Sequence, residues 1–210
     1  MIKNLLFDLG GVIMDIKRDN CVAAFKELGM KNPDEYLGEY VQAGPFAGIE
    51  DGSMTPAQFR DEMRRIIGNE NLTDRQIDTA FERFLTGIPV RRLRELEKLH
   101  HHYGMYLISN TNPIMWNDEI ARWFREDGHD VNYYFDGIVT SFEAKSMKPE
   151  RKIFMDVVEK YGIKQEETLF FDDSIKNCEA ARALGFQAQH VGEGQEFYAL
   201  LEEYPGIKEK

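Results

Sequence analysis

Residues 5–13 read LLFDLGGVI, an apolar run that leads into a carboxylate and two glycines. A short continuous apolar run of this kind predicts a buried strand, so Asp8 is expected at the carboxyl end of that strand. In open α/β sheets the ligand crevice lies outside the carboxyl ends of the strands. This stretch therefore predicts a parallel sheet with an acidic group at the edge that binds ligands.

A second apolar strand far along the chain ends in the same way. Residues 168–174 read TLFFDDS, which delivers Asp172 and Asp173 to a strand end. Adjacent carboxylates at the end of a buried strand are costly unless a cation neutralises them. Together with Asp8 they would form an oxygen-rich site of the kind that a hard cation such as Mg²⁺ prefers.

A third strand and a lysine complete the set of polar groups. Residues 105–111 read MYLISNT, so that Ser109 and Asn110 follow an apolar strand, and Lys148 precedes a predicted helix. Hydroxyl and backbone N–H groups can stabilise phosphoryl oxygens, and a lysine can balance the carboxylates. A nucleophilic carboxylate, a cation, a hydroxyl and a lysine together indicate phosphoryl transfer.

Composition excludes several classes of partner. The chain has 210 residues with 30% charged and 42% hydrophobic side chains, as is ordinary for a soluble globular protein. Its formal net charge of -11 disfavours nucleic acid and anionic membranes. Cys21 and Cys178 form no CxxC pair, and we find neither a signal peptide nor an apolar stretch of the roughly 18 residues that a membrane helix needs. We expect a cytoplasmic protein.

The chain divides by pattern into two parts. Residues 17–88 lack a comparable apolar strand and carry two helix-capping signatures, TPAQ at 55–58 and TDRQ at 73–76, each followed by apolar residues at helical spacing. From about residue 91 helices and strands alternate, which predicts a doubly wound parallel sheet. We therefore predict an α/β core of residues 1–16 plus 89–210 with an inserted helical-bundle cap of residues 17–88, and we expect the tail 206–210 to fray.

Taken in order, the four polar segments resemble the four motifs of the haloacid dehalogenase (HAD) superfamily. These are FDLGGV at 7–12, SNT at 109–111, KP at 148–149 and FDDS at 171–174. The resemblance covers nearly the whole chain, and the helical insert resembles the α-helical cap of that superfamily. The details are most similar to a sugar-phosphatase branch that includes α-D-glucose 1-phosphate phosphatases. The resemblance implies a Rossmann-like core and a hydrolase for a small phosphorylated metabolite.

It also implies a role for each matching residue. Asp8 would be the nucleophile that forms an aspartyl-phosphate, and Lys148 would assist catalysis. Ser109, Asn110 and Lys148 would bind the phosphate. The ligands of Mg²⁺ would be Asp8, the Gly10 carbonyl, Asp173 and Asp172, the last directly or through water. Asn177 could hydrogen-bond the acidic cluster.

Gly10 departs from the superfamily pattern, because most of its phosphatases have an aspartate there that moves protons. Two interpretations are open. Catalysis could survive, because general acid–base catalysis raises a rate by about 10²–10⁴-fold and its loss need not abolish turnover. Asp15 or Asp19 could then move protons in place of the missing aspartate. Alternatively, the protein could bind phosphate or metal without catalysis.

A third interpretation is a metal-independent haloacid dehalogenase. The pair Asp172 and Asp173 disfavours it, because uncompensated carboxylates would repel its carboxylate substrate. The sequence leaves the identity of the substrate and the oligomeric state open.

Overall fold

The computed structural model describes residues 1–38, 42–205 and 207. Its centre is a five-stranded sheet in the order β5-β4-β1-β6-β7, in which every neighbouring pair is parallel. This confirms the predicted parallel α/β fold. The strands are β1 (Asn4–Phe7), β4 (Gly104–Ser109), β5 (Gly137–Thr140), β6 (Thr168–Asp172) and β7 (Gln187–His190).

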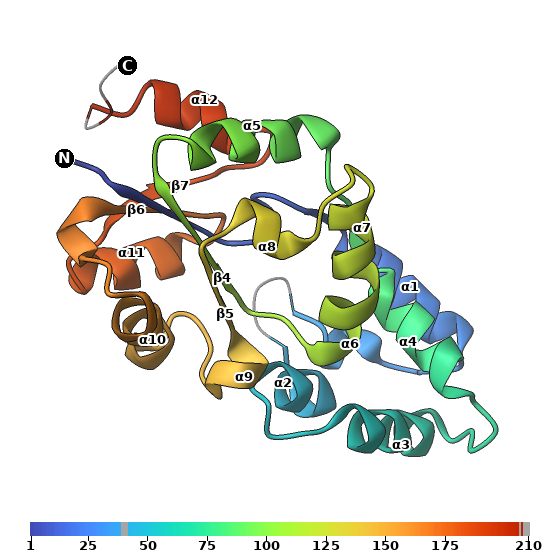
Figure 1. Cartoon of the computed structure of the whole chain (residues 1–210). Helices are drawn as coiled ribbons and strands as arrows, with labels where there is room; N and C mark the ends of the chain where they lie inside the picture. Colours follow the sequence, from blue (N-terminus) through green and yellow to red (C-terminus); the bar gives the residue numbers. More distant parts are fainter. Residues whose placement is uncertain (39–41, 206, 208–210) are drawn as a thin grey trace.

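Helices cover both faces of this sheet (Figure 1). Side chains on successive residues of a strand point to opposite faces, and in β1 Leu6 packs on one face while Leu5 and Phe7 pack on the other. The face of Leu6 is covered by α10 (Arg151–Tyr161) and α11 (Ile175–Ala183). The opposite face is covered by α5 (Val90–His100), α8 (Val131–Tyr134) and α12 (Phe197–Glu202). Two further short elements of this part of the chain are α9 (Ser141–Ala144) and η3 (Gln165–Glu167).

Aromatic packing fixes the middle of the sheet just before its functional edge. The Phe7 ring stacks on the Phe171 ring with centroids 5.2 Å apart, and Phe197 from α12 meets Phe7 edge-on at 5.2 Å. All three side chains are fully buried. Burial of one such side chain contributes about 1.5–3 kcal/mol, so the strand ends that follow Phe7 and Phe171 are held on a rigid base.

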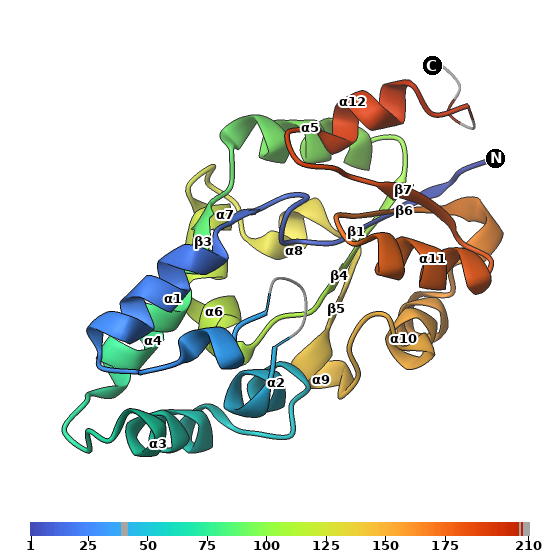
Figure 2. The same cartoon turned by 180° about the vertical axis from the view of Figure 1, so that it is seen from behind.

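The segment between β2 (Asp15–Ile16) and β3 (Leu85–Gly87) consists mainly of helices. These are α1 (Arg18–Glu27), η1 (Pro33–Glu35), α2 (Gly44–Glu50), α3 (Pro56–Ile67) and α4 (Asp74–Glu82). Figure 2 shows them gathered beyond one edge of the sheet, with α1 and α4 side by side. Their core is a cluster of four buried rings whose neighbouring centroids lie 5.1–5.2 Å apart, Phe25, Phe46, Phe59 and Phe81. The division into a core and a cap remains our interpretation.

One local prediction needs correction. Residues 17–88 were expected to be helical throughout, but Leu85–Gly87 forms β3, which pairs antiparallel with β2 (Asp15–Ile16). A strand of three residues is too short to show an alternation of apolar and polar side chains, and it depends on its partner strand for hydrogen bonds. The helical stretch that begins at Pro113 is not regular: α6 (Pro113–Met115) passes through a π-helical turn, η2 (Trp116–Ile120), into α7 (Ala121–Arg125).

Other expectations concern location and the tail. Among the described residues, no helix combines the length and apolar character needed to cross a bilayer. Cys21 and Cys178 are both buried free thiols. The tail expected to fray lies outside the described residues, except for Ile207.

Candidate active site

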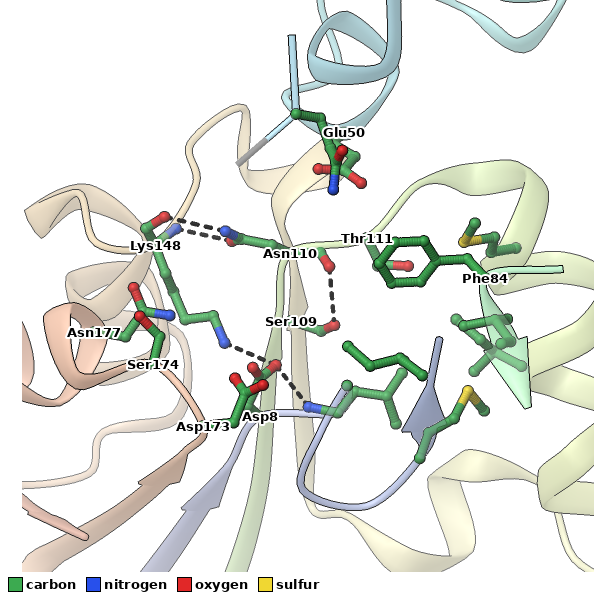
Figure 3. Close-up of a pocket in the computed structure, with 18 of the residues that line it drawn as sticks. Asp8, Glu50, Phe84, Ser109, Asn110, Thr111, Lys148, Asp173, Ser174 and Asn177 are labelled. Carbon is green, nitrogen blue, oxygen red and sulfur yellow. Dashed lines mark hydrogen bonds and ion pairs between the residues drawn. The ribbon is translucent and has the colours of Figure 1, made fainter. Parts of the chain in front are cut away.

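Strand register brings the predicted site residues to one edge of the sheet. In the central strand β1, Phe7 pairs with Leu107 of β4 on one side and with Phe171 of β6 on the other. The N–H of Asp8 donates to the Phe171 carbonyl at 2.8 Å, which continues the ladder by one residue. The polar residues that follow these three strands therefore meet outside their carboxyl ends, as Figure 3 shows.

Asp8 is buried and held by one of its two carboxylate oxygens. Its Oδ1 accepts from the Leu9 N–H at 2.6 Å and lies 2.7 Å from the Lys148 Nζ. Within the described part of the chain, its Oδ2 has no hydrogen-bond or ion-pair partner. This arrangement orients the carboxylate and leaves one oxygen available for a substrate or a cation.

Lys148 joins the two strand ends. Its side chain is 1% exposed, and its Nζ lies 2.7 Å from both Asp8 Oδ1 and Asp172 Oδ2. The Asn110 side chain makes two hydrogen bonds to the backbone of Lys148. The Asn110 Oδ1 accepts from the Lys148 N–H at 2.8 Å, and the Asn110 Nδ2 donates to the Lys148 carbonyl at 3.0 Å. Asn110 thus positions the ammonium group through its side chain.

Asp172 is fully buried, and both of its carboxylate oxygens have partners. Oδ2 binds Lys148, and Oδ1 accepts from the Ser174 N–H at 2.8 Å and from the Asn177 Nδ2 at 2.9 Å. The contact expected between Asn177 and the acidic cluster is confirmed. Asp172 therefore serves in this structure to orient the lysine and the loop after β6.

Asp173 faces the cavity beside the glycine turn that follows β1. A Cβ added to Gly11 would lie 2.3 Å from Asp173 Oδ2, and Gly11 has a φ of +72°. Glycine is needed here both for the left-handed backbone and for the close approach of the carboxylate. The Asp173 carbonyl accepts a hydrogen bond from His190 Nε2 at 2.9 Å, which ties this loop to the end of β7.

Burial and like charges perturb the ionisation of this cluster. Burial raises the pKa of Asp8 well above its usual range; Lys148 opposes this rise, while Asp172 and Asp173 reinforce it. Burial and the Asp172 charge raise the pKa of Asp173 to about 6. Burial would lower the pKa of Lys148, but Asp172 and Asp8 outweigh it and leave that pKa raised, so the lysine stays charged. One lysine faces three carboxylates, and the excess negative charge favours a bound cation.

The oxygen atoms present fit such a cation. Asp8, Asp172 and Asp173 each offer a carboxylate oxygen, and these atoms lie within 4.8 Å of one another. Gly10 lines the same cavity. Hard divalent cations such as Mg²⁺ bind carboxylate and carbonyl oxygens. Because both oxygens of Asp172 are already engaged, Asp8 and Asp173 are the carboxylates with an oxygen to spare.

A cavity of about 480 Å³ opens over these groups. Ser109, Asn110 and Lys148 line it on the sheet side, and side chains from the helical segment line it on the other side. Most of the latter are apolar, including Phe81 and Phe84. A cavity of this size holds a small metabolite.

Comparisons with known proteins agree with this geometry. The model of the haloacid dehalogenase-like hydrolase family matches residues 2–185. The chain belongs to the haloacid dehalogenase-like hydrolases. A curated relative, the D-ribitol-5-phosphate phosphatase of Bacteroides thetaiotaomicron, is 35% identical over 187 residues, which cover 89% of this chain and 90% of the relative.

Solved structures of HAD enzymes have the same fold. A HAD family enzyme from Bacteroides thetaiotaomicron, in complex with magnesium and inorganic phosphate, has 40% identity and a TM-score of 0.89, with 95% of this chain and 99% of that chain covered. A HAD-like family hydrolase from Porphyromonas gingivalis has 31% identity and a TM-score of 0.91, with coverages of 99% and 100%. The L-2-haloacid dehalogenase of Xanthobacter autotrophicus shares the fold at 19% identity and a TM-score of 0.61, with coverages of 99% and 85%.

The two acids that were considered as replacements for the aspartate missing at Gly10 of this hydrolase lie outside the cavity. Asp15 pairs with Arg92, whose Nη1 lies 2.6 Å from Asp15 Oδ1, and Asp19 is 81% exposed beside Arg18. Neither is among the described residues that line the cavity. The sequence could not reveal the first pairing, because Arg92 is separated from Asp15 by the whole helical segment.

Sequence reasoning also did not single out two polar residues of the cavity. Gln42 and Glu50 line it from the helical segment of the hydrolase. Glu50 begins the polar segment EDGS at residues 50–53. No strand end or charge partner marks either residue, so a single sequence carries little signal for them.

Proposed function

We propose that this chain is a magnesium-dependent phosphatase that hydrolyses a small sugar or polyol phosphate through a phosphorylated aspartate. The observation that carries the proposal is Asp8, a buried carboxylate that lines the cavity beside Lys148 and Asp173, with Oδ1 anchored and Oδ2 without a partner among the described residues. The D-ribitol-5-phosphate phosphatase among its relatives supports a phosphorylated polyol or sugar as substrate. The magnesium and phosphate bound by the similar HAD enzyme support the cation.

The residues of the site have complementary roles in this proposal. Asp8 attacks phosphorus, the bond from phosphorus to the leaving oxygen breaks, and the leaving oxygen takes up a proton. Water then attacks the phosphorus of the aspartyl-phosphate, which releases inorganic phosphate and restores the carboxylate. Lys148 orients Asp8 and balances the charge of the phosphoryl oxygens, to which Ser109 and the backbone N–H of Asn110 also donate.

Asp8, Asp173 and the Gly10 carbonyl would hold Mg²⁺, with Asp172 behind them acting through Lys148 or through water. When bound, Mg²⁺ offsets the negative charge that gathers between the carboxylates and the phosphoryl group. The helical segment 17–88 would act as a cap that excludes water and contacts the leaving group.

The proton carrier is the open part of the mechanism. Gly10 offers only backbone, and Asp15 and Asp19 are engaged outside the cavity. Without a dedicated acid, turnover would be slower by up to about 10²–10⁴-fold. The non-catalytic alternative rests on Gly10, whereas the free oxygen of Asp8 beside Lys148 favours catalysis. The dehalogenase alternative is disfavoured by the excess of carboxylates, which would repel a carboxylate substrate.

The test is phosphate release from sugar phosphates, polyol phosphates, nucleotides and aryl phosphates, with Mg²⁺ and with a chelator. We expect Mg²⁺-dependent release by the native chain and a loss of at least 10³-fold in Asp8→Asn, which should keep its fold by circular dichroism. Halide release from 2-haloacids is measured in parallel. Phosphate release that is equal in Asp8→Asn, or halide release that persists with chelator, would contradict the proposal.

A further inference from the structure

The helical segment contributes two polar groups to the cavity that the mechanism above does not use. Glu50, the last residue of α2, projects into the cavity from the helical segment, across from Asp8 and above Asn110 (Figure 3). Gln42 lines the cavity from the same segment. In the described part of the chain, the Glu50 carboxyl makes no hydrogen bond or ion pair, and the Gln42 Oε1 is buried without a hydrogen-bond partner.

The rest of this side of the cavity, as far as its residues are described, is apolar and carries no positive charge. The other side chains that line the cavity from residues 17–88 and from the helices directly after β4 are Phe81, Phe84, Leu85, Met115 and Ile120. Among the described lining residues, the basic ones come from the sheet side and are Lys148, Lys176 and His190. A buried polar group without a partner is costly, so this wall is suited to a ligand that supplies hydrogen bonds.

The position of Glu50 is fixed by contacts between its loop and α9. The Gly52 carbonyl accepts from the Lys145 Nζ at 2.9 Å. Gly52 has a φ of +73°, and a Cβ added to it would lie 2.2 Å from the Phe142 carbonyl oxygen. The backbone two residues after Glu50 is therefore pressed directly onto the α/β part, which holds the carboxyl over the phosphate site.

The carboxyl is uncharged near neutral pH. Burial raises the pKa of Glu50 to about 8, and the neighbouring Asp51 charge adds to the rise. A protonated carboxyl offers one O–H donor and a carbonyl acceptor. It does not repel a phosphate dianion, and it matches the donor and acceptor character of an alcohol.

The direction of the reaction brings the leaving group to this wall. If Asp8 attacks phosphorus in line, the leaving oxygen lies on the side of phosphorus away from Asp8, where Glu50 stands (Figure 3), and Gln42 lines the same cavity from the same segment as Glu50. This step rests on the proposed function. We propose that Glu50 and Gln42 bind hydroxyl groups of an uncharged polyhydroxy leaving group, so that the enzyme selects polyol or sugar phosphates over phosphates whose second group is an amine or a carboxylate.

The test compares two substrates that differ only in hydroxyl groups, a pentitol 5-phosphate and n-pentyl phosphate. The native enzyme should have at least a tenfold higher kcat/KM for the pentitol phosphate, because a site built to hydrogen-bond a hydroxyl discriminates strongly against its absence. 2-Aminoethyl phosphate and 2-phosphoglycolate should be at least tenfold poorer than the pentitol phosphate. Glu50→Ala and Gln42→Ala should each lower the preference for the pentitol phosphate at least fivefold.

Glu50→Gln is the matched variant, because its uncharged amide keeps a donor and an acceptor at the same place. It should recover most of the preference that Glu50→Ala loses. Glu70→Ala, an exposed acid in the turn before α4, is the control and should leave the preference unchanged. Thermal melting of each variant checks the fold.

Three results would overturn the inference. One is an unchanged preference in Glu50→Ala with the native enzyme active. Another is a collapse of kcat in Glu50→Gln on both alkyl phosphates but not on p-nitrophenyl phosphate, which would make Glu50 the proton donor to the leaving oxygen. The third is a native enzyme that releases no phosphate from any of these compounds, in which case the proposed function itself fails. An active native enzyme whose preference is unchanged in Glu50→Ala would contradict only the inference about Glu50 and leave the proposed function standing.

Discussion

Asp172 and Asp173 are neighbours in the sequence but have different surroundings. Asp172 is fully buried with both oxygens bound, whereas Asp173 is only partly buried and borders the cavity. The apolar run 168–171 predicts that acids follow a strand, but not which acid turns inward. That choice depends on partners that are distant in sequence, above all Lys148.

This difference predicts separate effects of two conservative substitutions. Asp173→Asn should raise at least tenfold the Mg²⁺ concentration that gives half of the maximal rise in melting temperature, because it removes a carboxylate with a free oxygen. Asp172→Asn should shift that concentration less than threefold but lower the free energy of unfolding by about 1–3 kcal/mol, because it weakens buried hydrogen bonds. Equal shifts in the two variants would mean that Asp172 is itself a direct ligand.

Gly11 and Gly68 form a second matched pair. Both have left-handed backbones, with φ of +72° and +76°, but a Cβ at Gly11 would collide with Asp173 whereas one at Gly68 meets nothing within 4 Å. Each alanine substitution should lower the free energy of unfolding by about 1–2 kcal/mol. Only Gly11→Ala should also weaken Mg²⁺ binding, measured by calorimetry, and equally tight binding in both variants would argue against Asp173 as a ligand.

Several site residues could be predicted from the sequence, and others could not. Asp8 and Ser109 follow apolar strands, which is a local pattern, and Lys148 was predicted through the motif order. Their convergence follows from strand register. Glu50 and Gln42 reach the cavity only because the helical segment folds over the sheet edge, and no local pattern encodes that approach.

Among the elements, the two capping boxes were predicted by sequence and are confirmed. The Thr55 and Thr73 hydroxyls accept from the N–H groups of Gln58 and Gln76, both at 3.3 Å. In each case the glutamine Oε1 accepts in return from the threonine N–H at 2.9 Å. A capping box uses groups three residues apart, so the sequence alone specifies it.

The cap of α4 gives a prediction at this scale. Thr73→Ala should lower the free energy of unfolding in urea by about 1 kcal/mol, because it leaves a helix N–H without its acceptor. Thr73→Ser keeps the hydroxyl and should stay within about 0.5 kcal/mol of the native chain. If Thr73→Ser loses as much free energy of unfolding as Thr73→Ala, the effect would come from the threonine methyl group instead.

The short antiparallel ribbon of β2 and β3 could not be predicted from the sequence. Asp15 pairs with Gly87 and Ile16 with Leu85, across the whole helical segment. Strands of two and three residues are too short to show an alternation of apolar and polar side chains. The hydrogen bonds of each strand exist only when the other strand is present. This ribbon joins the sheet to the helices, so tertiary contact rather than local propensity decides its structure.

In the molecule as a whole, three acidic residues from distant parts of the chain meet at the cavity between the sheet and the helical segment. The chain has a net charge of -11, yet Glu50, Asp8 and Asp173 are withdrawn from solvent at the cavity. Burial of acids raises their pKa values, and the folded state then holds protons that the unfolded chain releases. Global stability is therefore expected to depend on pH through this region.

Glu50 allows that dependence to be measured. Its pKa rises from 4.5 to about 8 on folding, so its contribution to stability is full below pH 4.5, declines as the pH rises, and is lost above pH 8. The free energy of unfolding of the native chain, relative to that of Glu50→Gln, should fall by roughly 5 kcal/mol between those limits. The comparison is made in chelator by urea unfolding, and a difference that is constant with pH would show that Glu50 is ionised throughout.

The central claim is that Asp8 is the group that becomes phosphorylated with the help of a divalent cation. Beryllium trifluoride mimics a phosphoryl group on an aspartate, and its binding can be followed by fluorine NMR. We predict protein-bound fluoride resonances for the native chain with Mg²⁺, none with chelator, and none for Asp8→Asn. Resonances that persist in Asp8→Asn, or their absence from the native chain with Mg²⁺, would contradict this account.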